Sequence, residues 1–417
     1  MAERPLDDRA ARLRLEPFAR IERPLSMPEY YHASIGCSRR TLEIQRESIF
    51  ILEAGGTGFD ADRWREAVDK ACAANPGTRL RLVGDSFRSR WINDGPPARL
   101  RVIEQTDWDG MSSEGVGFIR SEPFSLETGP NVEVTLVNHA PRGRMVIMRT
   151  PHAIMDGRGS LHFLAEIFRG LRGEELIGSN AGFSDVDLML AVGARSSLSK
   201  PIKTQWLTGA PQGHEQGDDW RRIRLHTEGR NILARIAVAM ADYMHQHSDL
   251  PALIAVPADL RRHVPGLVST ANFTNMLLVR LDRGDGVERF RHTIDELRSK
   301  RMDAHFAPWL SAFKLLPRSL LDRAISRTAS NFHKKRAFET AVISNLGRID
   351  PEPLSFGDFR PDACFALPVA GSVFSVLSNV GDRSEMILNM PRTLSSNGRF
   401  DDFVAYLHAR LAETENG

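Results

Sequence analysis

The sequence predicts an α/β protein in which mixed sheets are flanked by helices and the elements fall into two halves. Apolar segments of strand length alternate with segments whose apolar residues recur at spacings of three and four. The second half repeats the element order of the first without visible sequence repetition. At 417 residues the chain is also long for one core, so two units of roughly 200 residues are expected.

The first half contains several apolar runs of strand length separated by turn residues. Strands are predicted at residues 48–53, 78–83, 86–92, 100–103, 132–137 and 145–149. Asp60 can cap a helix that presents Trp64, Ala67, Val68, Ala71 and Cys72 on one face. A second helix, after the last strand, has Leu161, Leu164, Phe168 and Leu171 on one face.

A polar, Gly- and Ser-containing stretch separates this half from the second. Helices are predicted there at 231–244, 287–297, within 309–332 and at 400–411, with strands at 252–256, 273–281, 340–344, 374–379 and 385–390. We therefore divide the chain into an N-terminal lobe at 1–175, a crossover at 176–225 and a C-terminal lobe at 226–417.

Composition excludes several classes of protein. The formal charge of +2 gives no reason to expect a nucleic-acid or membrane-surface partner, and no apolar run approaches the ~20 residues of a membrane helix. The charged N-terminus lacks the apolar core of a signal peptide. Cys37, Cys72 and Cys364 form no disulfide framework, which fits a reducing compartment, so a cytoplasmic location is expected.

The stretch Arg144–Leu171 is the strongest candidate for a functional site. His152 follows the predicted strand, and Asp156 and Gly157 precede the helix, so a reactive side chain would stand at the end of a rigid element. Gly157 and Gly159 would let the chain bend before the helix. The same His-x-x-x-Asp spacing occurs at 214–218 and 245–249, but no buried strand precedes those two copies.

His152-Ala-Ile-Met-Asp-Gly157 resembles the HHxxxDG motif of the condensation-domain superfamily of acyltransferases, which includes chloramphenicol acetyltransferase, condensation domains of nonribosomal peptide synthesis and alcohol acetyltransferases. Pro151 replaces the first histidine of the motif. Residues 73–81, 123–130, 257–261 and 344–348 resemble further family segments, in the family order and along nearly the whole chain.

The resemblance implies a pseudo-dimer of two chloramphenicol-acetyltransferase-like lobes with an active-site tunnel between them and a latch-like strand near 340–350. It implies transfer of an acyl group from a thioester, either acyl-CoA or a phosphopantetheine-linked group on a carrier protein, to an alcohol or amine. The product would be an ester or amide, most plausibly in secondary metabolism. His152 would act as general base, with no bound metal or redox cofactor, in a monomer.

The resemblance also assigns roles to neighbouring residues. Asp156 would be mainly structural and would pair with Arg261 to hold the loop. The backbone of Gly157 would lie near the reacting carbonyl, where its N–H is a candidate oxyanion donor.

Three further residues are candidates for substrate binding. Ser344 and Asn345 either face the tunnel or form a strand-ending turn, which Asn-Leu-Gly also suits. Arg158 either meets an anionic group of a substrate or is a solvated surface residue.

Two other readings stay open. A non-catalytic condensation-like domain would only bind a carrier protein or partner enzyme, and Pro151 is the feature that favours it. A thioester hydrolase would use the same histidine with water as acceptor. The sequence shows no GxSxG elbow, residues 54–58 lack the Lys-Ser/Thr of a P-loop, and His245 and His247 have no further ligand at metal spacing.

Overall fold

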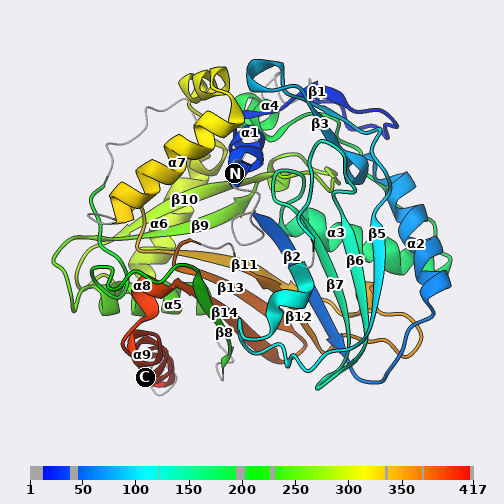
Figure 1. The fold of residues 1–417 in the computed structure, drawn as a ribbon. Coiled ribbons are helices and arrows are strands. Elements are labelled where there is room, and N and C mark those ends of the chain that lie inside the picture. The colour runs from blue at the N-terminus through cyan, green and yellow to red at the C-terminus, as the bar shows by residue number, and fades with distance from the viewer. Residues whose placement is uncertain are drawn as a thin grey trace, which may run out of the picture.

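The computed structural model describes residues 13–37, 46–120, 122–193, 202–225, 231–333, 337–368 and 371–413. Two large mixed sheets dominate the fold, and Figure 1 shows the blue and cyan strands of the first beside the green and orange strands of the second. The first sheet has the order β12 (Ala363–Leu367), β2 (Glu47–Ala54), β7 (Gly143–Pro151), β6 (Glu133–Ala140) and β5 (Arg99–Gln105). The second has the order β10 (Thr274–Leu281), β9 (Ala252–Asp259), β11 (Ala341–Ile349), β13 (Phe374–Val380), β14 (Arg383–Pro391) and β8 (Asp218–Leu225).

A small third sheet has the order β1 (Glu22–Pro24), β4 (Arg90–Ile92) and β3 (Arg81–Val83). Strand β5 is parallel to β6, and β11 is parallel to both β9 and β13, whereas the other pairs are antiparallel. The predicted α/β class with mixed sheets is therefore confirmed.

Helices cover the outer faces of the sheets. The first sheet packs against α2 (Ala61–Ala74) and α3 (Gly157–Arg172), and the second against α5 (Ile232–Met244), α6 (Val287–Ser299) and α9 (Arg399–Glu413). Helix α1 (Met27–Ser34) packs against η7 (Pro308–Leu315) and α7 (Arg318–His333), as Figure 1 shows. The remaining helices are α4 (Asp185–Val192), α8 (Arg392–Ser395), η2 (Pro76–Arg79), η3 (Ser86–Arg88), η4 (Val116–Arg120), η5 (Leu260–His263), η6 (Met302–Ala304) and η8 (Glu352–Leu354).

Several predicted elements are present where residues close together in the sequence determine the local structure. Asp60 caps α2 by accepting a hydrogen bond from the backbone N–H of Arg63. The predicted hairpin at 374–390 is formed by β13 and β14. The predicted turn at 345–348 is different: β11 continues through it, and its pairing with β13 shifts register between Asn345 and Arg348. Gly347, with φ of +73°, absorbs the extra residue of this bulge.

The structure also contains elements that the sequence pattern did not reveal, namely α1, α4, β8 and β12. Strand β8 comes from the expected crossover and forms an edge of the second sheet, while residues 194–201 of that crossover lie outside the described residues. Strand β12 comes from the second half of the chain but pairs with β2 of the first sheet. The lobe boundaries themselves stay predictions.

Both faces of the central strands β2 and β7 are buried, which explains the apolar runs at 49–52 and 145–148 in their centres. Alternate residues of these strands pack against α2 and α3. The intervening ones form a separate core with Trp220 of β8, Phe365 of β12 and Ile387 of β14. The two sheets are thus joined by an apolar layer, and the end of β7 is held rigidly.

A buried ion network crosses the same boundary. Arg222 of β8 donates to Glu53 of β2 over 2.8 Å and to Glu385 of β14 over 2.6 Å. None of the Arg222 side chain is exposed, and its guanidinium lies 4.0 Å from the ring centroid of Phe365. Both carboxylates are also buried, and each has one further cation: Arg142 lies 3.3 Å from Glu53 and Arg383 lies 2.6 Å from Glu385.

We expect Arg222→Ala to lower the free energy of unfolding by about 3 kcal/mol, because two buried carboxylates lose the fully buried cation they share and keep only the partly exposed Arg142 and Arg383. Urea denaturation followed by circular dichroism measures this change. The adjacent Arg221 provides the control, since it forms an exposed ion pair with Asp401, and Arg221→Ala should cost no more than about 1 kcal/mol. Equal losses in the two variants would contradict this account.

Candidate active site at the His152 motif

His152 directly follows β7 and lies between the two halves of the chain. Its backbone N–H donates to the carbonyl of Arg46 over 2.8 Å, which ties it to the start of β2. From the second half, Asn272 Nδ2 donates to the carbonyl of His152 over 2.9 Å and lies 3.3 Å from its Nδ1. Burial lowers the pKa of His152, and the opposing charge of Asp156 does not restore it. The imidazole is therefore neutral at pH 7 and able to accept a proton.

Asp156 is the N-cap of α3 and is almost completely buried. Its two carboxylate oxygens accept five hydrogen bonds: from the backbone N–H groups of Gly159 and Phe273, from the hydroxyl of Thr274, and twice from the guanidinium of Arg261. The Arg261 contacts are 2.9 and 3.0 Å long and form a two-pronged ion pair. The partner expected from the sequence is therefore in contact with Asp156.

Burial by itself raises the pKa of Asp156, but the charge and hydrogen bonds of Arg261 outweigh it and hold the pKa below its ordinary range. Arg261 also donates to the carbonyls of Ser269 and Ala271, so the same guanidinium fixes the loop that carries Asn272. Both oxygens of Asp156 thus accept hydrogen bonds from groups other than His152. The carboxylate therefore stabilises the loop.

Gly157 and Gly159 lie in the first turn of α3 and not in a bend before the helix. Neither has a left-handed φ. The space around them differs: a Cβ on Gly159 would stand 2.2 Å from the carbonyl oxygen of Thr270, whereas a Cβ on Gly157 would meet only Leu346 at 3.4 Å and Phe50 at 3.5 Å. Gly159 is therefore needed because the backbone of the second half approaches α3 closely.

Ser344 and Asn345 lie on β11, which approaches the start of α3. Ser344 is half-buried, whereas Asn345 is exposed and its side chain accepts a hydrogen bond from the backbone of Gly347. Arg158 is exposed, with a guanidinium nitrogen 3.8 Å from the Cβ position of Gly347. The bulge of β11 thus lies next to Gly157 and Arg158, and Asn345 supports the bulge.

The sequence pattern did not single out His32, which the structure places against His152. The two imidazole rings are stacked with centroids 4.6 Å apart and planes inclined by 23°. Burial, followed by the charge of His152, lowers the pKa of His32 well below its ordinary value. A signal for its helix was available, since Ser26 and Glu29 form a capping box at the start of α1.

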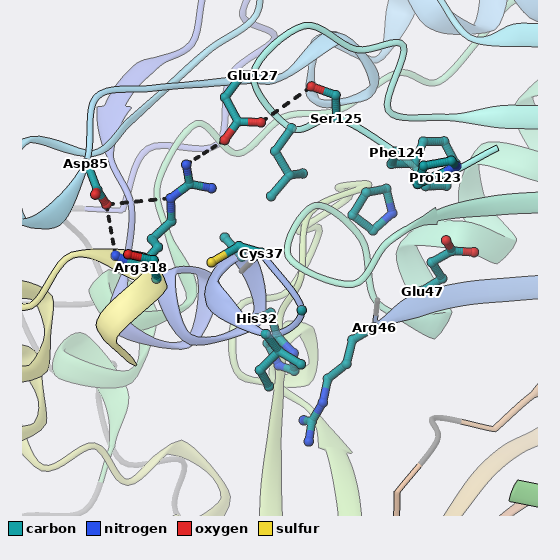
Figure 2. Close-up of a pocket in the computed structure, with 16 residues that line it drawn as sticks. His32, Cys37, Arg46, Glu47, Asp85, Pro123, Phe124, Ser125, Glu127 and Arg318 are labelled. Atoms are coloured by element: carbon teal, nitrogen blue, oxygen red, sulfur yellow. Dashed lines mark hydrogen bonds and ion pairs between the residues drawn. The ribbon is translucent and has the colours of Figure 1, made fainter. Parts of the chain in front are cut away.

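A cavity of about 420 Å³ opens beside His32, and its lining includes Pro151 but not His152. His32, Arg46, Glu47, Pro151 and Arg318 are among the residues that line it. Figure 2 shows Arg318 with its acidic partners Asp85 and Glu127 on the side of the cavity away from Glu47.

A second cavity, of about 780 Å³, lies between η4 and β8 and includes Ile49 and Arg120 in its lining. Arg120 is 3.6 Å from Glu47, so an ion pair separates the two cavities near the start of β2. Space for ligands therefore exists on two sides of the strand pair that ends at His152.

Among the described residues, no group of three or more His, Cys, Asp or Glu side chains is arranged to hold a metal ion. Within the same part of the chain, no helix combines the length and apolar character needed to cross a bilayer.

We expect Gly159→Ala to lower the free energy of unfolding by about 1–3 kcal/mol, because the new methyl group would overlap the backbone of Thr270. Gly157→Ala is the matched control and should change it by no more than about 0.5 kcal/mol. Thermal and urea unfolding of both variants check this difference. The explanation is wrong if both alanines are tolerated equally.

No family model matches this chain. Among curated proteins it is similar to an uncharacterized protein of Mycobacterium tuberculosis, Rv2305 in strain H37Rv and MT2362 in strain CDC 1551, with 25% identity over 346 residues that cover 72% of this chain and 78% of the relative.

Solved structures of condensation domains are similar over nearly the whole chain. The condensation domain of the Monacolin K polyketide synthase MokA covers 94% of this chain and 97% of its own, with a TM-score of 0.63 and 13% identity. The first condensation domain of the calcium-dependent antibiotic synthetase, in complex with a substrate analogue, has the same coverage with a TM-score of 0.60 and 17% identity.

The mutant starter condensation domain of rhizomide synthetase in complex with C8-CoA covers 88% of this chain and 89% of its own, with a TM-score of 0.59 and 15% identity. The expected resemblance is thus confirmed at the level of the fold. The chain has the fold of the condensation domains.

Proposed function

We propose that this protein is a condensation-type acyltransferase that moves an acyl group from a thioester to an alcohol or amine. The observation that carries the proposal is the state of His152: a half-buried, neutral imidazole at the end of β7, held between the two halves of the chain and next to Pro151 in the wall of a cavity. Asp156 is fully engaged by Arg261 and backbone groups, so His152 is the base of the motif.

The reaction follows from these groups. The acceptor oxygen or nitrogen adds to the thioester carbonyl while His152 takes its proton, and a tetrahedral oxyanion forms. The intermediate then collapses, the carbon–sulfur bond breaks, and the imidazolium returns the proton to the departing thiolate. Asn272 Nδ2 lies 3.3 Å from Nδ1 of His152, so the second half of the chain contacts the ring at the nitrogen next to its backbone.

The oxyanion would form near the first turn of α3. Gly157 is the first residue of this helix, so its N–H has no partner within the helix, and the helix dipole favours negative charge there. Apolar atoms of Leu346 and Phe50 lie 3.4 and 3.5 Å from the Cβ position of Gly157, and a hydrogen bond to an oxyanion is stronger in an apolar setting.

The thioester donor would be acyl-CoA or an acyl group on a carrier protein. The rhizomide synthetase domain holds C8-CoA in its complex, which supports the first source by likeness of fold. Arg158, Ser344 and Asn345 stay candidates for substrate contacts: the bulge of β11 brings Gly347 next to Arg158, so both elements border the start of α3. The 420 Å³ cavity, whose lining includes His32 and Pro151, is the candidate entry for one of the two substrates.

A non-catalytic domain that binds a carrier protein or partner enzyme is the second candidate. Pro151 in place of a motif histidine favours it, since degenerate members of a family lose motif residues. The same assay separates the two functions.

We expect release of free thiol from a panel of acyl-CoA and acyl-pantetheine donors only when pooled alcohols or amines are present. His152→Ala should lower the rate at least about a hundredfold, because the base is lost. His139→Ala, an exposed histidine on β6, is the matched control and should leave the rate unchanged. Release without an acceptor would instead establish hydrolysis, and no release from any donor would favour the binding domain.

The pH dependence offers an independent check. Because the folded-state pKa of His152 is lowered, its neutral form persists below the ordinary titration range of histidine. We expect kcat/KM to fall on the acid side with a midpoint below about 6.5. A midpoint at or above that value would show that His152 is not the group that must be neutral.

A further inference from the structure

Helix α1 delivers a second imidazole to the site. Its N-terminus is fixed by the capping box of Ser26 and Glu29, and Arg23 adds an ion pair of 2.6 Å to Glu29. The hydroxyl of Tyr30 donates to the carbonyl of Leu316 over 2.6 Å. These contacts fix the part of helix α1 that directly precedes His32. The helix therefore holds His32 in a defined position.

The contact between His32 and His152 is face to face. With centroids 4.6 Å apart and planes inclined by only 23°, the rings overlap as a stack. Burial lowers the pKa of both imidazoles, so at pH 7 two neutral rings meet without charge repulsion. Arg46 adds a positive charge that disfavours protonation of either ring, while Asp156 favours protonation of His152.

One nitrogen of the His32 ring is not used by the fold: Nδ1 is buried and has no hydrogen-bond partner among the described residues. A buried polar nitrogen without a partner costs free energy. The part of His32 that makes a defined contact with His152 is therefore the face of its ring. His32 also lines the 420 Å³ cavity together with Pro151, so it forms the wall between this cavity and His152.

We propose that His32 is a positioning residue for His152: its ring covers one face of the catalytic imidazole while Asn272 holds the edge. This inference rests on the proposed acyl transfer for its catalytic consequence, but the positioning itself is a property of the folded protein. A displacement of about 1 Å in a base can cost about a hundredfold in rate. Face and edge contacts together leave the His152 ring with one orientation.

The motif has lost its first histidine to Pro151, yet a second imidazole is still present at the site. It comes from an element about 120 residues earlier in the chain. His32, which lies outside the single-histidine motif, therefore holds the histidine of that motif in place.

Two variants of His32 separate the ring from its nitrogen atoms. His32→Phe keeps a flat ring over His152 and should keep kcat within about threefold of the wild type. His32→Ala removes the ring and should lower kcat at least about tenfold, with the KM of the donor changed less than about threefold. His139→Ala is again the control, and circular dichroism with urea unfolding establishes that each variant is folded.

A spectroscopic readout does not depend on activity. In protein labelled with 15N-histidine, we expect the His152 resonances, identified by their loss in His152→Ala, to report one neutral tautomer in the wild type and in His32→Phe. In His32→Ala the signals should move toward tautomer averaging. If His152 gives the same spectrum in wild type and His32→Ala, the proposal is overturned. It is also overturned if His32→Phe loses as much kcat as His32→Ala.

The kinetic and spectroscopic measurements together distinguish the proposed acyl transfer from the proposed positioning of His152 by His32. A wild-type protein without acyl transfer, but with a His152 spectrum that depends on the ring at position 32, would remove the proposed function and keep the positioning. Acyl transfer that depends on His152 but is unaffected by His32→Ala would do the reverse.

Discussion

The ion pair between Asp156 and Arg261 is the interaction on which the site depends. It joins the first turn of α3 to a loop of the second half, and the same carboxylate caps α3 and accepts from the backbone of Phe273. Because both partners are largely buried, loss of either would leave a charge without compensation. The pair therefore fixes the relative position of α3, the loop at 269–272 and His152.

This arrangement separates two roles that the motif places four residues apart. Asp156 holds the structure, and His152, with a lowered pKa, is left as the neutral group. The buried Arg222 network supports the same boundary at the other end of the sheets, where Glu53 and Glu385 meet one cation. Buried ion pairs thus stabilise the structure at two places, and half-buried His152 lies near the first of them.

The sequence determined the parts of the fold that depend on neighbouring residues. Asp60 caps its helix, the 374–390 hairpin turns where Gly and Asp occur, and β7 followed by α3 frames His152. The resemblance carried by a short motif also led to the fold, to Arg261 as the partner of Asp156 and to His152 as a candidate base. The roles of the site residues await the experiments above.

Tertiary structure alone decided what depends on distant contacts. Strand β12 joins the other half's sheet, and β8 forms an edge strand from a segment without strong apolar alternation. Gly159 is required by the backbone of Thr270, and His32 reaches His152 from α1, which no spacing in the sequence reveals. The physical reason is that hydrogen-bonding and apolar periodicity are local properties, whereas burial and ring stacking between residues far apart in the chain arise only once the halves pack together.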